Sequence, residues 1–156
     1  MSRFVATLES GGAIPASPRK ILVPVDFSEE SAAALRYAAT LAQQSGGAID
    51  VIHVWSSSSY ASVETVGSIH DRAAETLQSF LAPFAGNSGI SGNVTSGEPG
   101  PVIASLSSEY DLLVMGRKAQ DGASEVMLGS VAQKVVADAR CPVLTVTETR
   151  ESLAAQ

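Results

Sequence analysis

"KILVPVDFSEESAAALRYAATLAQQSGG", residues 20–47, joins an apolar run directly to a helical pattern. The run KILVPV is short and continuous, which is typical of a buried strand in a parallel sheet. Ser28 is a natural N-cap, and Glu29 and Glu30 stand in the first turn, where the helix dipole favours acidic residues. Gly46 and Gly47 end the pattern, so a helix is predicted over residues 31–44. Its apolar stripe consists of Ala34, Leu35, Ala38, Leu41 and Ala42.

The same alternation of strand and helix continues to the end of the chain. Further strands are predicted at AIDVIHVW (residues 48–55), near residues 90–95, at DLLVM (residues 111–115) and at PVLTV (residues 142–146). Helices are predicted over residues 69–82, 101–107 and 130–139. This order predicts one α/β domain with a mostly parallel sheet and right-handed crossovers.

The sequence patterns at the two ends of the chain differ from those of this domain. Residues 1–18 have weak periodicity and contain ESGGAIPASP, so they are predicted to form a mobile N-terminal arm. The domain then covers residues 19–147, and residues 148–156 form a polar C-terminal tail.

Composition excludes several classes of function. The chain has 156 residues, of which 45% are hydrophobic and 17% charged, as expected for a soluble globular protein. The net charge of −6 and the lack of a basic stripe argue against a nucleic-acid partner. No apolar run approaches the roughly 18 residues of a membrane span, and the first residues lack the apolar core of a signal peptide. We therefore expect a cytoplasmic protein without a membrane partner.

Two strand ends carry the residues of greatest chemical interest. The first strand ends at Asp26, and the strand at residues 111–115 runs into the loop of VMGRKAQDGASEVMLGSVAQKVV, residues 114–136. This loop is not a Walker A motif, because no Lys-Ser/Thr pair follows a glycine, and the chain contains no GxGxxG. Ordinary P-loop and dinucleotide-binding sites are thus disfavoured.

The end of this loop has the features of a phosphate site. Gly129 and Ser130 begin a helix whose first amides lack partners within the helix, and these amides and the Ser130 hydroxyl are able to bind phosphate oxygens. Gly116 would allow a ribose to approach the backbone. The alternative is that Gly129 only shapes the start of the helix and Ser130 only caps it.

The chain resembles the universal stress protein family from about residue 20 to residue 146. The resemblance lies in KILVPVDFSEESAAALRYAATLA, VIHVW, SGEPGPVIASLSSEYDLLVMG and LGSVAQKVVADARCPVLTV. It implies a single doubly wound, Rossmann-like three-layer sandwich with a five-stranded parallel sheet of order 3-2-1-4-5. In that order the first and fourth strands are neighbours, so Asp26 and Gly116 would face one crevice.

The nucleotide-binding branch of this family has the loop motif G-x-x-G, nine residues, then G-S or G-T. Gly116 matches the first glycine, Ala119 replaces the second, residues 120–128 form the spacer, and Gly129 and Ser130 complete the motif. If position 119 needs a positive φ, alanine costs about 1 kcal/mol or more. Arg117 and Lys118 are either compensating charges for phosphates or solvated loop cations.

The resemblance implies a set of binding residues for an adenine nucleotide. Asp26 would hydrogen-bond the ligand near the base or ribose, besides capping the first helix. The full predicted set is Pro24, Val25, Asp26, Val54, Met115, Gly116, Arg117, Ala119, Gly129, Ser130 and Val131. The implied cofactor is ATP in the first place, with ADP or AMP as alternatives and Mg²⁺ as a companion ion.

The last strand is the predicted contact with a second copy. An apolar edge strand left open favours aggregation. In this family the last strand resembles an edge that pairs with its twin, so Val143, Leu144 and Val146 are the expected homodimer residues. The alternative is an edge covered by the N-terminal arm or the C-terminal tail.

Other candidate sites are weaker. His53 and His70 lack metal-ligand spacing, and no GxSxG elbow or catalytic triad is recognisable, so neither a metal site nor catalytic residues are predicted. Asp121 and Glu125 form a solvated acidic patch or an outer Mg²⁺ shell. The single cysteine, Cys141, precedes an apolar run and is expected to be a packed thiol.

Together these observations predict a universal stress response protein that binds an adenine nucleotide as a homodimer and acts as a sensor or regulator. Nucleotide would order residues 116–130 and so alter a surface for unknown protein partners. Two alternatives are a dimeric interaction protein that binds no nucleotide, which Ala119 supports, and a slow ATPase.

Overall fold

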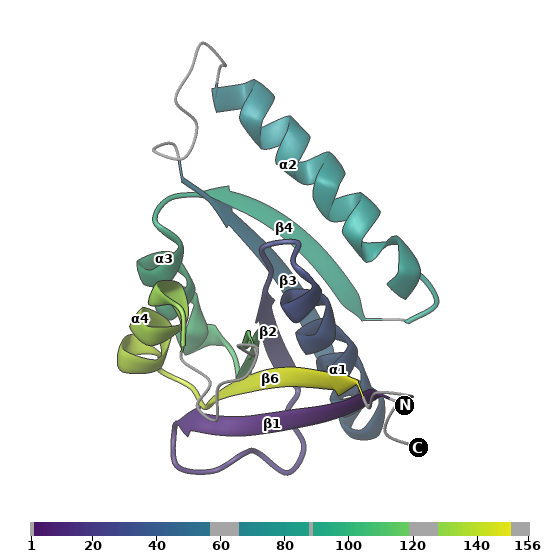
Figure 1. Ribbon diagram of the computed structural model, residues 1–156, viewed down its shortest axis with the longest axis vertical. Coiled ribbons are helices and arrows are strands. Elements are labelled where there is room, and N and C mark those ends of the chain that lie inside the picture. Colours follow the sequence, from purple (N-terminus) through teal and green to yellow (C-terminus); the bar gives the residue numbers. More distant parts are fainter. Residues whose placement is uncertain (1, 57–65, 88, 119–127, 151–156) are drawn as a thin grey trace.

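A six-stranded sheet organises the molecule (Figure 1). The computed structural model describes residues 2–56, 66–87, 89–118 and 128–150. The strands lie in the order β1-β6-β5-β2-β3-β4. Their bounds are β1 (Ser2–Ser10), β2 (Lys20–Pro24), β3 (Ala48–Trp55), β4 (Ile90–Ser96), β5 (Leu112–Gly116) and β6 (Val143–Arg150).

Helices cover both faces of the sheet and complete three layers (Figure 1). They are α1 (Glu29–Ser45), α2 (Val66–Leu81), α3 (Pro99–Leu106) and α4 (Ser130–Asp138), with short 3-10 helices η2 (Ala82–Phe84) and η3 (Ser107–Glu109). Side chains alternate along β2, so Ile21 and Val23 pack with α1 while Leu22 packs with α3 and α4. A smaller cluster joins α2 to Trp55 of β3.

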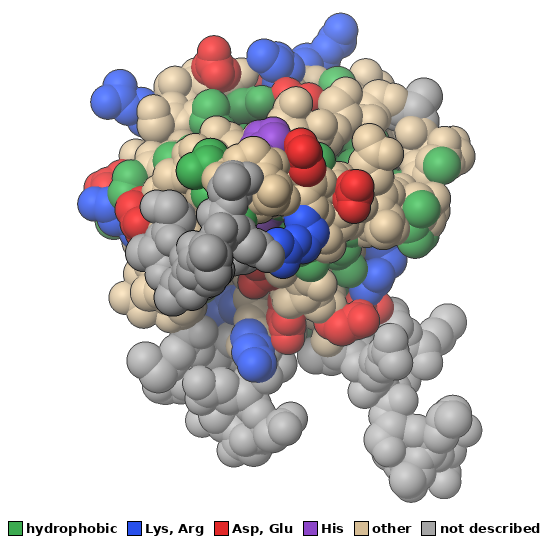
Figure 2. Space-filling model, turned by 90° about the horizontal axis from the view of Figure 1, so that it is seen from above, with side chains coloured by type: hydrophobic (Ala, Val, Ile, Leu, Met, Phe, Trp, Pro, Cys, Tyr) green, Lys and Arg blue, Asp and Glu red, His purple; other side chains and the backbone are tan. Residues whose placement is uncertain are grey.

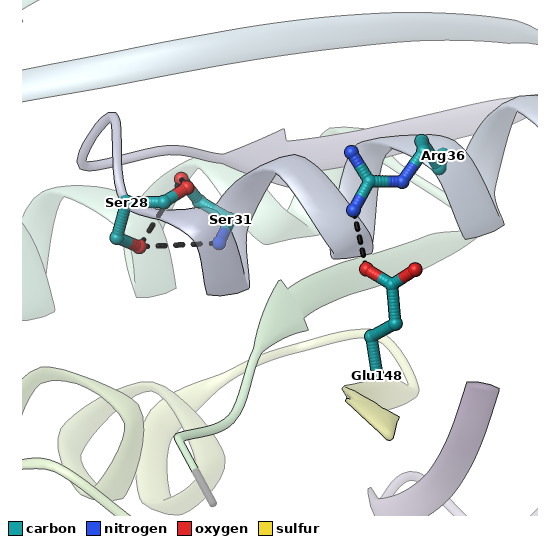
Figure 3. A network of polar contacts seen from close by, with 4 residues as sticks. All are labelled: Ser28, Ser31, Arg36 and Glu148. Carbon is teal, nitrogen blue, oxygen red and sulfur yellow. Dashed lines mark hydrogen bonds and ion pairs between the residues drawn. The ribbon is translucent and has the colours of Figure 1, made fainter. Parts of the chain in front are cut away.

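Helix α1 has the caps that its sequence predicts, but it starts at Glu29 and ends at Ser45 rather than covering residues 31–44. Ser28 is the N-cap, and its side chain accepts a hydrogen bond from the Ser31 amide at 3.2 Å (Figure 3). Gly46 ends the helix in the left-handed conformation with φ 74°. Arg36, on the same helix, forms an ion pair with Glu148 of β6 (Figure 3).

The predicted doubly wound sheet is confirmed. The five strands predicted in the order 3-2-1-4-5 are β4-β3-β2-β5-β6, and each neighbouring pair among them is parallel. The winding reverses between β2 and β5, since β3 lies on one side of β2 and β5 on the other.

The sixth strand corrects the prediction for the N-terminal arm. Residues 2–10 are not an unattached arm, because β1 pairs antiparallel with β6 from Ser2↔Arg150 to Ser10↔Val143. The side chains of Ala6 and Leu8 pack against the core beside α1. The polar tail also begins later than predicted, because β6 continues to Arg150 as the partner of β1.

The edge expected to pair with a second copy is therefore occupied within the chain. The outer edge of β6 carries β1, which is the alternative of an edge covered by the N-terminal segment. Val143, Leu144 and Val146 each have an exposed fraction of 0%. Their side chains pack in the two cores of this chain, so they offer no surface to a partner in this arrangement.

Two further features concern function only indirectly. Cys141 is buried in the core beside α3 and α4, and burial, followed by the nearby charge of Asp111, raises the pKa of its thiol to about 11. Over the stretches of chain that the structure describes, no helix is both long and apolar enough to cross a membrane.

Candidate functional site

A pocket of about 460 Å³ lies at the carboxyl ends of β2 and β5. These strands are paired through Ile21↔Leu112 and Leu22↔Leu113, so the residues that follow them meet at one edge of the sheet. Ligands of doubly wound folds bind at this kind of switch point, and the volume falls within the range of about 300–1,000 Å³ typical of ligand pockets.

The residues predicted from sequence converge on this pocket. Its lining includes Pro24, Val25, Asp26, Val54, Met115, Gly116, Arg117, Gly129, Ser130 and Val131. Ala119, Asp121 and Glu125 lie outside the described residues. Whether alanine is tolerated in place of the second glycine of the motif is therefore not decided by the geometry. The geometry thus brings the described part of the predicted set together, while its role in binding stays a prediction.

Asp26 is held in a fixed orientation at the pocket. Its Oδ1 accepts hydrogen bonds from the Ser28 amide at 3.0 Å and from the Ser28 hydroxyl. Partial burial by itself raises the pKa of this carboxyl group, but the hydrogen bonds from Ser28, with a contribution from Ser31, lower the pKa below its ordinary value. Asp26 is therefore an ionised acceptor at neutral pH.

The residue after Asp26 has an unusual backbone. Phe27 has φ 67°, a left-handed conformation that is uncommon for a bulky side chain. Its ring lies against His53, with centroids 4.2 Å apart, and against Phe80 at 5.7 Å. The Nδ1 atom of His53 lies 2.8 Å from the Val25 carbonyl oxygen. This packing fixes the turn that carries Asp26 into the pocket.

Two glycines of the loop motif have different structural roles. A Cβ atom at Gly116 would lie 2.4 Å from the Glu30 carbonyl oxygen and 2.9 Å from the Ser31 amide nitrogen. Gly116 is therefore required by the close approach of α1 to β5. Among the described residues, a Cβ atom at Gly129 would have no neighbour within 4 Å, and its φ of −66° suits any residue. The described part of the fold therefore does not require glycine here, whereas a ligand close to the backbone would.

The start of α4 has backbone donors that no side chain of the described residues caps. Gly129 is the N-cap and has no side chain to bond the first amides of the helix. Ser130 is exposed, and Gly129, Ser130 and Val131 all line the pocket. The first amides of a helix and its dipole favour an anion, so this end of the pocket suits phosphate oxygens.

Arg117 is already engaged by an acidic residue. Its Nη1 atom lies 2.8 Å from Oε1 of Glu9, which belongs to β1. The expectation that Arg117 is either a phosphate ligand or a solvated cation thus misses a third state, an ion pair within the protein. Lys118 is exposed and also lines the pocket.

Sequence reasoning left several pocket residues unassigned. Ser28, Glu30 and Ser31 come from the first turn of α1, and Pro99 and Ile103 come from α3. The first three follow Asp26 closely, and Pro99 follows the end of β4, so their place at the same edge of the sheet was available as a signal. The described residues contain no group of three or more His, Cys, Asp or Glu placed to hold a metal ion.

Charges of both signs are mixed on the face of the molecule shown in Figure 2. On the face shown in Figure 2, Lys and Arg side chains are scattered among acidic, neutral and hydrophobic ones. With a net charge of −6, attraction of an anionic ligand depends on local donors such as the start of α4.

Comparison with known proteins identifies the family to which the chain is related. The model of the universal stress protein family matches residues 18–147. Universal stress protein MJ0531 of Methanocaldococcus jannaschii is 27% identical over 144 residues, which cover 85% of this chain and 84% of the relative.

Two solved structures have the same fold. Universal stress protein UspA from Lactobacillus plantarum has a TM-score of 0.67 at 22% identity and covers 85% of this chain and 100% of its own. A universal stress protein in complex with cAMP has a TM-score of 0.52 at 21% identity, and the match covers 82% of this chain and 95% of that protein's chain. The match over residues 18–147 spans the parallel sheet, its helices and the pocket: the chain belongs to the universal stress protein family.

Proposed function

We propose that this chain binds an adenine nucleotide in the pocket between β2 and β5 and acts as a sensor or regulator in a stress response. ATP is the first candidate, with ADP and AMP as alternatives. The observation that carries the proposal is the convergence of the predicted binding residues around one pocket at the switch point of the sheet.

Each part of the pocket suits one part of such a ligand. The side chains of Val25, Val54 and Met115 are apolar and nearly buried, and they would pack against the base. Asp26, kept ionised by its hydrogen bonds, would accept from ribose hydroxyl groups or from a base N–H. Gly129 leaves open space beside the first amides of α4, which would bind phosphate oxygens.

The cAMP complex of a family member supports an adenine-containing ligand. In that protein a universal stress protein fold is found with a cyclic adenine nucleotide. We extend this ligand class to our chain because the pocket here has an acidic acceptor near one end and helix amides at the other.

The proposed action is regulatory rather than catalytic. Nucleotide binding would report a state of the cell and so alter a surface for protein partners. Mg²⁺ would accompany the phosphates of ATP or ADP. Cytoplasmic location stays a prediction from sequence.

One observation favours a different function, a protein interaction module without nucleotide. Arg117, a cation that lines the pocket, forms an ion pair with Glu9. The homodimer through the last strand that the family resemblance implies would form only after β1 leaves the outer edge of β6, so under both proposals the chain is a monomer while β1 is docked.

Equilibrium binding of adenosine, AMP, ADP and Mg-ATP tests the proposal. We expect Asp26→Ala to weaken all four ligands, because it removes the acceptor for ribose or base, while Asp71→Ala, outside the pocket, leaves them unchanged. Equal affinities of Asp26→Ala and the unaltered chain would reject the assigned site. Release of ADP or AMP from ATP over hours would favour the slow ATPase instead.

A further inference from the structure

Glu9 occupies an irregular position in β1, and its side chain contacts Arg117, a residue that lines the pocket. The register between β1 and β6 shifts between Leu8 and Ser10, so Glu9 lies at a β-bulge. Bulges redirect a side chain and often occur beside functional sites. Here the Glu9 Oε1 atom accepts a hydrogen bond from the Thr145 hydroxyl at 2.7 Å and from Arg117 Nη1 at 2.8 Å.

The contact is well shielded from solvent. The side chains of Arg117 and Glu9 are 20% and 16% exposed, and Thr145 is 1% exposed. The Coulomb attraction between two charges is stronger in such a shielded place than at the surface. If one partner is lost, the other charge stays partly desolvated without compensation, which is unfavourable.

Arg117 connects this contact to the ligand site. It directly follows Gly116 at the end of β5 and lines the pocket together with Gly129 and Ser130. Its guanidinium group suits phosphate as well as carboxylate, since both present paired oxygens to its N–H groups. A phosphate at the start of α4 and the carboxylate of Glu9 are therefore rival partners for one cation.

We propose that Glu9 competes with the phosphate groups of a bound nucleotide for Arg117, so that nucleotide binding and docking of the end of β1 oppose each other. The inference rests on the proposed function. It makes Glu9 a positioning residue, which acts on the ligand through Arg117 rather than by touching it. When a phosphate group binds Arg117, Glu9 loses its ion pair with Arg117 and retains its hydrogen bond with Thr145. Residues 8–10 then separate from β6 more often. By linkage, a firmly docked β1 weakens phosphate binding by the same factor.

Glu9→Gln separates this role from a structural one. The amide keeps the size of the side chain and an oxygen for Thr145, but it releases Arg117 from the ion pair. We expect Mg-ATP to bind about tenfold more tightly to Glu9→Gln, while adenosine, which has no phosphate, binds both proteins equally. Glu148→Gln is the matched control, because it also removes one negative charge from a Glu–Arg pair, with Arg36, away from the pocket.

Hydrogen exchange of the unaltered chain gives a second test that needs no variant. Mg-ATP is expected to speed amide exchange at Leu8 and Ser10, and adenosine to leave it unchanged. If both ligands bind and Glu9→Gln changes neither affinity, or if ATP does not affect exchange in β1, the competition is refuted while the nucleotide site stands. If neither ligand binds either protein, the proposed function fails and this inference fails with it.

Discussion

Gly116 and Gly129 look equivalent in the sequence motif but differ in what surrounds them. At Gly116 the backbone of α1 approaches so closely that a Cβ atom would lie 2.4 Å from the Glu30 carbonyl oxygen. We expect Gly116→Ala to lower the free energy of unfolding by about 1–3 kcal/mol, the usual range for overpacking. Urea denaturation measures this effect.

Gly129→Ser is the matched control for that variant. The added side chain meets open space, and serine is a good N-cap for α4, so stability is expected to stay the same or rise slightly. Equal stabilities of Gly116→Ala and Gly129→Ser would contradict the steric role given to Gly116.

The carboxylate of Asp26 should make stability depend on pH in a defined direction. Its folded-state pKa is lowered from 3.8, so its stabilising contribution is fully present above that value and is lost as pH falls through the folded pKa. We expect the stability difference between the unaltered chain and Asp26→Asn to shrink as pH falls from 6 toward 3. Denaturant unfolding at several pH values measures it, and a difference that grows with acidity would refute the assignment.

Much of the site at this scale follows from sequence, because residues after buried parallel strands meet at one edge of the sheet. The prediction that Asp26 and Gly116 share a crevice also needed the strand order, which came from the family resemblance. The sequence does not reveal why Gly116 must be glycine, since the approach of α1 is a tertiary contact. Nor does it reveal that Arg117 is paired, because its partner Glu9 is 108 residues away in the chain.

At the scale of elements, β1 is the part of the fold that sequence reasoning missed. The alternation of Phe4, Ala6 and Leu8 was a strand signal, but the Gly- and Pro-containing residues that follow favoured a mobile arm. Among the parallel strands, β2 and β5 were easier to predict, because each is a continuous apolar run that is buried. An added antiparallel edge strand is fixed mainly by its partner, here β6.

Leu8 and Val5 offer a matched pair for testing β1 as a fixed element. Leu8 packs against the core beside α1, whereas Val5 is 53% exposed. We expect Leu8→Ala to lower the free energy of unfolding by about 1–2 kcal/mol and Val5→Ala to change it by less than about 0.5 kcal/mol. If the segment were an unattached arm, thermal or urea unfolding would give the same small change for both.

At the scale of the whole molecule, β1 decides whether the outer edge of β6 is available. Docked β1 supplies backbone partners to β6, so the full chain is expected to sediment as a monomer at micromolar concentration. Deletion of residues 2–10 would expose an edge strand with unpaired backbone groups, and we expect that protein to self-associate. Analytical ultracentrifugation, with circular dichroism to verify folding, compares the two. A stable dimer of the full chain whose β1 amides remain protected would contradict this account.

Calorimetric titration with Mg-ATP decides whether the pocket between β2 and β5 is a nucleotide site. Three proteins are compared: the unaltered chain, Gly129→Val, and Gly86→Val as control, since a Cβ atom at Gly86 also meets open space but lies outside the pocket. We expect binding with a Kd on the order of micromolar for the unaltered chain and the control, and loss of binding in Gly129→Val. Absence of binding by the unaltered chain at millimolar ATP, or equal binding by all three proteins, would contradict this expectation.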